Sequence, residues 1–345
     1  MAGTGKAHLH VGADALLTVE DLVVEFPVGR TGLKVHAVTG ISFDVLPGET
    51  LGLVGESGCG KSTTGRAIMQ LPRPTSGKIV FQGQELTTLH GEQMRQLRTN
   101  VQMIFQDPIS SLNPRRRIKE IVAEPLNIWN IGTRAERDAK VREVLEAVGI
   151  DPDVGGDRRP HQFSGGQCQR ICIARALVLE PKMIICDEPV SALDVSVQAQ
   201  VLNLLEDLKK KYGLTLIFIA HDLAVVKNVS DRVAVMYLGK VCEVAPSDEL
   251  YMRPSHPYTD LLLKAIPVPD PTVLPDPDSR IVGEIPSPMF PPSGCHFRTR
   301  CPRASDKCAA EEPTLVDIGE GHYVACHHPL TVRSDPATAG ASSAS

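Results

Sequence analysis

The sequence has no long apolar run, no excess of positive charge and no export signal. It contains 345 residues with a formal net charge of −5. Its most apolar stretches, such as 214–220, are as long as a strand and far short of the roughly 18 apolar residues of a membrane-spanning helix. The mild acidity disfavours nonspecific binding to nucleic acid, which needs a basic face. The N-terminus lacks the basic start and apolar stretch of a secretory signal. We therefore expect no nucleic-acid partner and no membrane span within this chain.

Strands and helices alternate along the first three quarters of the chain. Apolar and β-branched runs predict strands over 17–26, 35–46, 50–54, 182–186 and 214–220. Helical periodicity is found over 61–71, 117–128, 134–148, 166–179 and 195–212. The segments 233–237 and 240–245 are typical of a closing hairpin. Such alternation predicts an α/β fold, with a parallel sheet flanked by helices.

The composition changes near residue 266. Residues 1–16 precede the first strand and are predicted to be a disordered leader. Between 266 and 293 there are nine prolines, which exclude a continuous helix or a central strand. We expect an extended connector that leads to a small cysteine module at about 294–328. The last residues, 329–345, are rich in Ala and Ser and are predicted to be disordered.

A glycine-rich segment follows the strand 50–54 and begins the next helix. It reads Gly55-Glu56-Ser57-Gly58-Cys59-Gly60-Lys61-Ser62, with Thr63 next, and fits the phosphate-loop pattern G-x-x-x-x-G-K-[ST]. Backbone N–H groups of such a loop surround phosphates, and the helix N-terminus adds partial positive charge. Lys61 should reach the β- and γ-phosphates, and the Ser62 hydroxyl should ligate Mg²⁺. A chance glycine-rich turn is disfavoured by the complete match in this context.

A second strand ends in two carboxylates. Asp187 and Glu188 follow the apolar run 183–186, at the edge of an open α/β sheet where ligands bind. Acidic residues often end strands, so this signal is weak alone. After a phosphate loop it predicts that Asp187 holds Mg²⁺ through water and that Glu188 polarises an attacking water.

A phosphate loop defines a large superfamily, and a second segment indicates one family within it. This segment reads Phe163-Ser164-Gly165-Gly166-Gln167. Here the chain resembles the nucleotide-binding subunits of ABC transporters, whose second ATP contact is a Leu-Ser-Gly-Gly-Gln loop; Phe163 replaces the leucine. Ser-Gly-Gly at a helix start is another anion-binding arrangement. In the family this loop closes on the γ-phosphate that is bound by a partner subunit.

Further residues agree with the family in order and spacing. The resemblance implies that Gln106 senses the γ-phosphate and Mg²⁺, that His221 contacts the γ-phosphate, and that Asp194 lies in the loop that crosses the dimer interface. With Glu188, Gln106 and His221 are thus the predicted catalytic residues. Phe26 lies where the family stacks an aromatic ring on adenine, although a Phe at a strand end is more often part of the core.

The resemblance extends from about 17 to 328 and implies a P-loop ABC ATPase core over 17–265. This core has a mixed sheet with flanking helices and a helical subdomain at about 107–180. The tail, 266–328, is similar to that of the oligopeptide and dipeptide importers, although nickel importers share much of it.

The expected cofactors are ATP and Mg²⁺. The implied partners are a paralogous ATPase subunit, two membrane-spanning permease subunits and an extracytoplasmic solute-binding protein. They would hold the chain at the cytoplasmic side of the plasma membrane. A soluble ABC ATPase acting on DNA or ribosomes is the distant alternative, and the chain has neither the heptads nor the basic patch of that class.

Four of the nine cysteines lie in the tail: Cys295, Cys301, Cys308 and Cys326. Without an export signal, metal binding is favoured over disulfides. The spacing lacks the Cys-x-x-Cys knuckles usual for zinc. Four thiolates can hold a [4Fe–4S] cluster, which members of this importer branch carry at the matching cysteines. A cluster, zinc and unliganded reduced thiols all stay open on the residues alone.

Overall fold

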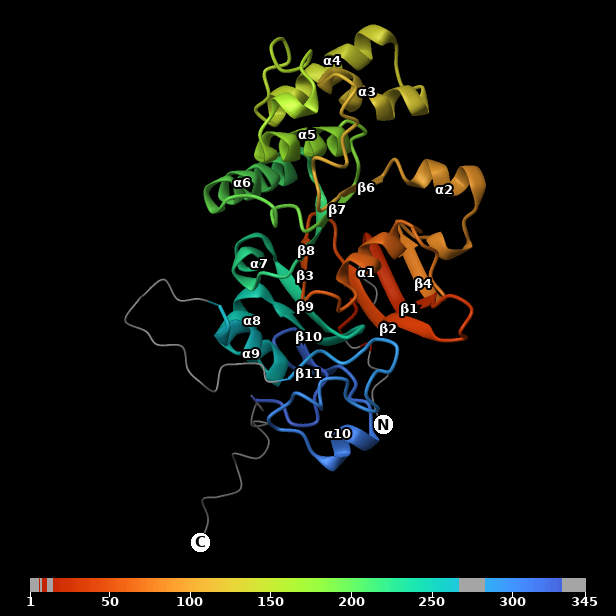
Figure 1. The fold of residues 1–345 in the computed structure, drawn as a ribbon, viewed down its shortest axis with the longest axis vertical. Helices are drawn as coiled ribbons and strands as arrows, with labels where there is room; N and C mark the ends of the chain where they lie inside the picture. Colours follow the sequence, from red (N-terminus) through yellow and green to blue (C-terminus); the bar gives the residue numbers. More distant parts are fainter. Residues whose placement is uncertain (1–5, 7, 11–14, 267–282, 331–345) are drawn as a thin grey trace, which may run out of the picture.

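A mixed eight-stranded sheet forms the centre of the molecule (Figure 1). The computed structural model describes residues 6, 8–10, 15–266 and 283–330. The strand order is β11-β12-β10-β9-β3-β8-β7-β6, and the strands from β9 to β6 run parallel. The bounds are β3 Thr50–Val54, β6 Val101–Ile104, β7 Met183–Asp187, β8 Thr215–Ala220, β9 Arg232–Tyr237, β10 Lys240–Pro246, β11 Val316–Gly319 and β12 His322–Val324. The predicted mixed sheet and the 233–245 hairpin are confirmed.

A separate antiparallel sheet has the order β2-β1-β4-β5. Its strands are β1 Leu17–Pro27, β2 Lys34–Val45, β4 Ser76–Phe81 and β5 Gln84–Glu85. In β1 the alternation of buried residues shifts between Val19 and Leu22, where the pairing with β2 also shifts. Asp21 has a positive φ of 48° at this bulge. The extra residue returns Leu22 to the core face and leaves Asp21 outside.

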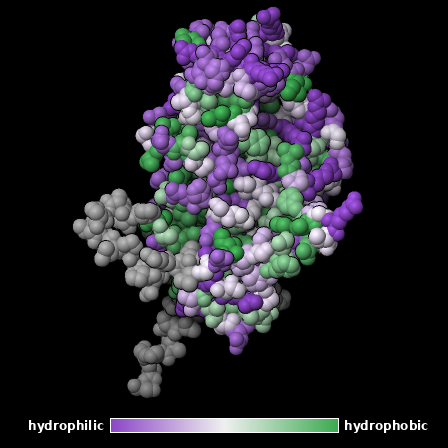
Figure 2. All heavy atoms as spheres, viewed as in Figure 1, coloured by the Kyte–Doolittle hydropathy of each residue, from purple (hydrophilic) through white to green (hydrophobic). Residues whose placement is uncertain are grey.

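Helices cover the main sheet and extend beyond it. The longer ones are α1 Lys61–Ile68, α3 Ile118–Trp129, α4 Arg134–Ala147, α5 Gly165–Leu177, α6 Val195–Tyr212 and α9 Pro257–Lys264. Shorter ones are α2 Gly91–Leu97, α7 Leu223–Val229, α8 Ser247–Met252 and α10 Asp306–Ala310. Helices α3, α4 and α5 pack together at one end of the molecule (Figure 1). On the face drawn in Figure 2 this end is mainly hydrophilic.

Local chemistry explains where these helices begin and end. Helix α4 starts at a capping box in which Thr133 and Glu136 exchange hydrogen bonds. The prediction placed the end of the 61–71 helix too late, since α1 ends at Ile68. The reason is Gln70, which has a positive φ of 56° and allows the Leu71 N–H to bond back to the Arg66 carbonyl at 2.8 Å, an arrangement that ends helices.

The C-terminal segment, which contains the predicted cysteine module, packs against the main body. Strand β12 pairs with β10 and thereby extends the central sheet. Phe297 is 1% exposed, and its ring lies 5.1 Å from that of Tyr237 and 5.2 Å from that of Tyr258. These three rings form one aromatic cluster between β9, α9 and the cysteine segment. Of the connector prolines, those from 267 to 277 lie outside the described residues.

Part of the predicted disordered leader packs against the body. His8 is 2% exposed, and its Nε2 lies 2.6 Å from the Ser42 carbonyl oxygen. Both the N–H and the ring Nδ1 of His10 contact the Asp44 carboxylate. The sequence of this segment did not predict these contacts, because their partners are residues of β2 that lie more than 30 positions further along the chain.

A buried carboxylate joins β10 to the C-terminal elements. Glu243 is fully buried and accepts hydrogen bonds from the N–H groups of Ser255 and His256, at 2.6 and 3.1 Å. The His322 ring nitrogen Nε2 lies 2.6 Å from the same carboxylate. His256 Nδ1 accepts the Tyr258 N–H at 3.0 Å and so caps α9. Burial lowers the pKa of His256 from 6.5 to about 4.

The lowered pKa of His256 predicts a loss of stability in mild acid. Below about pH 6.5 the unfolded chain binds a proton at this ring, whereas the native chain stays neutral until about pH 4. The free energy of unfolding should therefore fall by about 2 kcal/mol from this group between pH 7 and pH 5. His256→Asn keeps an acceptor at the cap but does not titrate. Urea unfolding at several pH values should give a shallower decline for this variant; an unchanged decline would contradict the assignment.

Candidate functional site

A pocket of about 920 Å³ lies at the edge of the main sheet where its parallel strands end. Ten of the predicted site residues line it: Phe26, Ser57, Gly58, Gly60, Lys61, Ser62, Thr63, Gln106, Glu188 and His221. They come from the end of β1, the loop after β3, helix α1, the loop after β6 and the ends of β7 and β8. Residues that are far apart in the sequence are thus brought to one cavity, as expected for the carboxyl edge of an open α/β sheet.

The phosphate loop packs too closely against its neighbours for any side chain at two of its glycines. A Cβ on Gly55 would lie 2.1 Å from the Met236 carbonyl oxygen, and one on Gly60 would lie 2.2 Å from that of Ala37. Both glycines also have positive φ, 148° and 107°. At Gly58 a Cβ would meet only open space, which is the side on which a ligand can approach.

Lys61 holds the loop in the conformation seen. Its side chain is buried, and Nζ donates to the carbonyl oxygens of Gly55 and Glu56 at 2.7 and 3.0 Å. The Cys59 Sγ is a third partner of Nζ, at 3.8 Å. A buried ammonium whose partners are all uncharged can serve as the counter-charge for an anion. Behind it, burial raises the pKa of the Cys59 thiol, which keeps this loop residue neutral.

Two oxygen donors meet at the start of α1. Ser62 Oγ donates to Asp187 Oδ1 at 2.6 Å, and Asp187 is fully buried. Arg66 approaches the other carboxylate oxygen at 3.5 Å. A hydroxyl beside a carboxylate, next to a phosphate-sized cradle, fits the preference of Mg²⁺ for one or two protein oxygens together with phosphate oxygens.

The three predicted catalytic side chains converge. Glu188 accepts a hydrogen bond from Gln106 Nε2 at 3.0 Å, and His221 Nδ1 lies 3.2 Å from the same carboxylate oxygen. The Glu188 side chain is 11% exposed and that of His221 is 50% exposed. Glu188 has a φ of 49°, a conformation that a residue with a side chain adopts only when its surroundings enforce it. Its N–H is bonded to the Ile219 carbonyl, which ties the end of β7 to β8.

The other end of the pocket has an apolar wall. Phe26, Val35, Ala37 and Pro288 line it, and Phe26 is 38% exposed. Such a surface can stack against a planar base. Pro288 was missed by sequence reasoning, because nothing in a proline-rich connector indicates which proline returns to the pocket; its carbonyl accepts the His36 N–H at 3.0 Å.

The Ser-Gly-Gly-Gln segment and Asp194 do not line this pocket. Ser164 begins α5 and forms a reciprocal capping box with Gln167. Gly165 and Gly166 follow within the first turn, and a Cβ on Gly166 would lie 2.3 Å from a Val197 methyl group. Asp194 precedes α6 without a side-chain capping bond. The helix start at α5 is therefore not part of the lining of the pocket that contains the chain's own phosphate loop.

The four tail cysteines lie in one region as free thiols. Cys295 donates its N–H to the Cys308 carbonyl at 2.8 Å, and burial raises the pKa values of Cys295, Cys301 and Cys326, the last to about 11. Within the described ranges no three His, Cys, Asp or Glu side chains are arranged to hold a metal ion.

The nearby histidines have other partners. Their ring nitrogens contact, in turn, the Leu238 carbonyl, Glu243, the Glu311 carbonyl and the Ser305 hydroxyl; the histidines are His296, His322, His327 and His328. The metal assignment therefore stays a prediction.

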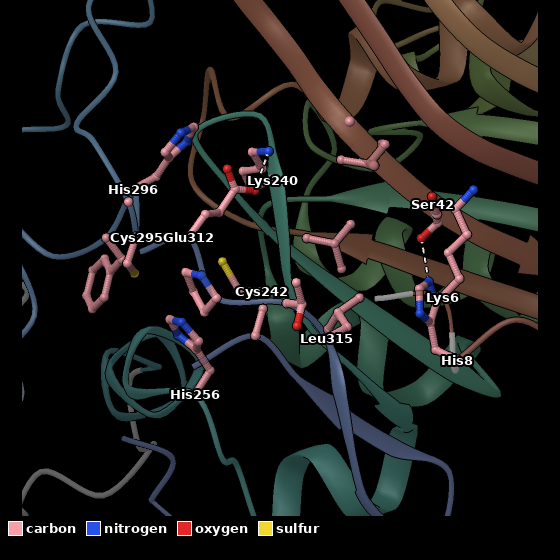
Figure 3. Close-up of a pocket in the computed structure, with 18 of the residues that line it drawn as sticks. Lys6, His8, Ser42, Lys240, Cys242, His256, Cys295, His296, Glu312 and Leu315 are labelled. Atoms are coloured by element: carbon pink, nitrogen blue, oxygen red, sulfur yellow. Dashed lines mark hydrogen bonds and ion pairs between the residues drawn. The ribbon is translucent and has the colours of Figure 1, made fainter. Parts of the chain in front are cut away.

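A second, smaller cavity of about 160 Å³ lies away from the phosphate loop (Figure 3). His8 and Ser42 line one side of it, and Cys242, His256 and Cys295 line the other. Near its rim Lys240 forms an ion pair with Glu312 at 2.6 Å. This cavity contains none of the residues predicted to bind nucleotide.

Comparisons with known proteins agree with this geometry. The family model described as "ABC transporter" matches residues 38–191, and the one described as "Oligopeptide/dipeptide transporter, C-terminal region" matches residues 242–308. The chain is 50% identical to the oligopeptide transport ATP-binding protein AppF of Bacillus subtilis, over 91% of this chain and 97% of that one. It is 51% identical to the oligopeptide transport ATP-binding protein OppF of Salmonella typhimurium, over 90% and 95%.

Solved structures give the same result for the core. CbiO1 of Clostridium perfringens, part of the ABC transporter complex CbiONQ, superposes with a TM-score of 0.61 at 30% identity and covers 69% of this chain and 91% of its own. A dimeric, post-hydrolysis ATP-binding cassette, MJ0796 with ADP and Pi, has a TM-score of 0.61 at 26% identity, with 67% and 98% covered.

The close packing at Gly60 predicts a severe effect of a single methyl group. Gly60→Ala would drive its Cβ into the Ala37 carbonyl at a positive φ, so the loop must shift, and ATP affinity should fall by more than about tenfold. Gly213→Ala is the matched control, since Gly213 also has a positive φ but no atom within 4 Å of a Cβ. Equilibrium titration with ATP should separate them; equal affinities would show that the Gly60 contact does not shape the site.

Proposed function

Because the chain belongs to the ATP-binding subunits of ABC transporters, in the oligopeptide/dipeptide branch, we propose that it hydrolyses ATP to drive peptide import across a membrane. The observation that carries the proposal is the convergence of Gln106 and His221 on Glu188 beside the phosphate loop. A nucleotide-binding chain without turnover would not need this arrangement.

The chain's own residues supply position and charge for the reaction. Bound Mg²⁺ would neutralise phosphate charge, and it would be held by Ser62, by Gln106 and, through water, by Asp187. The Lys61 ammonium and the N–H groups at the start of α1 hold the phosphates. Glu188 accepts a hydrogen bond from the attacking water, and Gln106 and His221 orient that carboxylate. Phosphoryl transfer depends mainly on such positioning and electrostatic stabilisation.

The proposed active unit is a dimer of ATPase subunits. The Ser164-Gly165-Gly166-Gln167 helix start and Asp194 lie outside the pocket, which supports a role for them at nucleotide bound by another subunit. The MJ0796 cassette is itself described as dimeric. We propose that this chain's partner is a paralogous ATPase subunit, with ATP between each phosphate loop and the partner's Ser-Gly-Gly segment.

The proposed complex also contains membrane partners. Among the described residues no helix is long and apolar enough to cross a membrane. We propose two membrane-spanning permease subunits and an extracytoplasmic solute-binding protein, with this chain bound peripherally at the cytoplasmic face. Ile109 is 62% exposed three residues after Gln106, and we propose that it lies in the surface that contacts the permeases. The peptides taken up are chosen outside this chain.

The tail cysteines are proposed to hold a [4Fe–4S] cluster, with zinc as the alternative. Support comes from their number, their common location and the match of residues 242–308 to the oligopeptide-transporter C-terminal region. Thiolates are the ligating form, so a bound metal would have to displace protons whose pKa values are raised in the free thiols.

Turnover should depend on the Glu188 carboxylate. Glu188→Gln keeps the shape of the side chain but removes the charge that accepts from water, so ATP should bind while hydrolysis falls by about 10²-fold or more. Glu206→Gln is the control, because Glu206 pairs only with Lys210 on exposed α6. ATPase assays of the assembled complex measure both; normal turnover in Glu188→Gln would remove the catalytic assignment.

The cysteine proposal has its own spectroscopic test. Anaerobically purified protein should contain iron and absorb in the visible range, and both signals should vanish in Cys301→Ser and Cys308→Ser. Cys168→Ser, at a buried cysteine of α5, should keep them. Colourless protein with one zinc per chain would favour zinc, and protein without either metal would leave only thiols.

A further inference from the structure

The C-terminal segment makes a direct polar contact with the phosphate loop. Arg300, between Cys295 and Cys301, donates from Nη1 and Nη2 to the two carboxylate oxygens of Glu56, at 2.7 and 2.9 Å. The Arg300 side chain is only 5% exposed, and that of Glu56 is 22% exposed. Glu56 is the first residue after Gly55 in the loop. A two-bond, largely desolvated Arg–carboxylate pair has one preferred geometry, which makes it a strong positioning contact.

The same loop residue is held by its backbone. The Glu56 N–H donates to the Tyr258 hydroxyl at 2.8 Å, and Arg300 Nη1 also approaches the Tyr237 hydroxyl at 3.3 Å. Tyr237 and Tyr258 pack against Phe297 in the aromatic cluster. The hydrogen bond to Glu56 raises the pKa of the Arg300 guanidinium, so the charge is permanent. Glu56 is thus fixed at its carboxylate and at its N–H by parts of one rigid cluster.

These contacts also affect Lys61, the residue that is predicted to bind phosphate. The carbonyl of Glu56 is also a partner of the Lys61 ammonium, at 3.0 Å. Moving Glu56 would therefore move Lys61 and change the direction of the loop N–H groups. The C-terminal segment also reaches the apolar end of the pocket through Pro288, whose carbonyl accepts the His36 N–H. It thus lines the pocket at Pro288 and contacts the phosphate loop at Glu56.

We propose that Arg300 is a positioning residue for ATP binding, which makes the cysteine-containing tail a structural part of the nucleotide site. This inference rests on the proposed ATPase function. It implies that any change in the tail that displaces Arg300 also changes the affinity for ATP. The rate of the hydrolysis step itself should change little.

The test compares variants of the two charged partners in the full chain. Arg300→Gln should weaken equilibrium binding of ATP by about tenfold, the change expected when a charge-assisted contact is lost, and KM should rise more than kcat falls. Arg300→Lys keeps the charge but not the two-bond geometry and should recover part of the affinity. Arg298→Gln is the matched control, since Arg298 lies in the same segment and its side chain bonds only to Ser293.

A double-mutant comparison makes the result specific to the pair. Glu56→Gln combined with Arg300→Gln should bind ATP about as weakly as the worse single variant, because both remove the same contact. Additive losses, or an Arg300→Gln affinity equal to that of Arg298→Gln, would overturn the proposal. Thermal unfolding of each variant checks that the fold is intact. Normal turnover in Glu188→Gln would contradict the proposed function. The ATP-binding comparison of the Arg300 and Glu56 variants could still be interpreted in that case.

Discussion

The phosphate loop packs tightly between the two sheets at Gly55 and Gly60. Its glycines abut the Met236 carbonyl on β9 of the main sheet and the Ala37 carbonyl on β2 of the antiparallel sheet. The Gly239 N–H, in the β9–β10 turn, donates to the Cys59 carbonyl at 2.9 Å. The loop can therefore keep its shape only while both sheets keep their relative position. Other features of the fold can be understood as ways of keeping that position.

One such feature is a buried charge network far from the nucleotide pocket. Arg232, on β9, bonds to Glu49 just before β3 and to Asp44 on β2, at 2.5 and 3.0 Å. It thereby joins the two sheets near one end, as the phosphate loop does near the other. Desolvation of a charge is costly, so these three groups stay buried only together, and loss of one would leave the others uncompensated. Their value is in fixing geometry more than in adding net stability.

Much of the core could be predicted because its signals are local. The apolar runs of β3, β7 and β8, the phosphate loop and helix α6 each carry their pattern within a few residues. The contacts that were missed depend on distant segments. No local pattern shows that Arg300 meets Glu56, that Pro288 returns to the pocket, or that β12 pairs with β10. The bulge at Asp21 and the positive φ of Glu188 are likewise imposed by packing against strands elsewhere in the chain.

The pairing of β10 with β12 has a consequence for synthesis of the chain. Strand β10 ends at Pro246, but its partner on that side is made of residues 322–324, and Tyr323 in turn packs edge-on against His8 at 5.9 Å. During translation this edge of β10 stays unpaired until residues 322–324 have emerged. Bare strand edges invite pairing with other chains. A chain released before residues 322–324 are made would contain the phosphate loop but leave this edge of β10 unpaired, and it should be prone to aggregate.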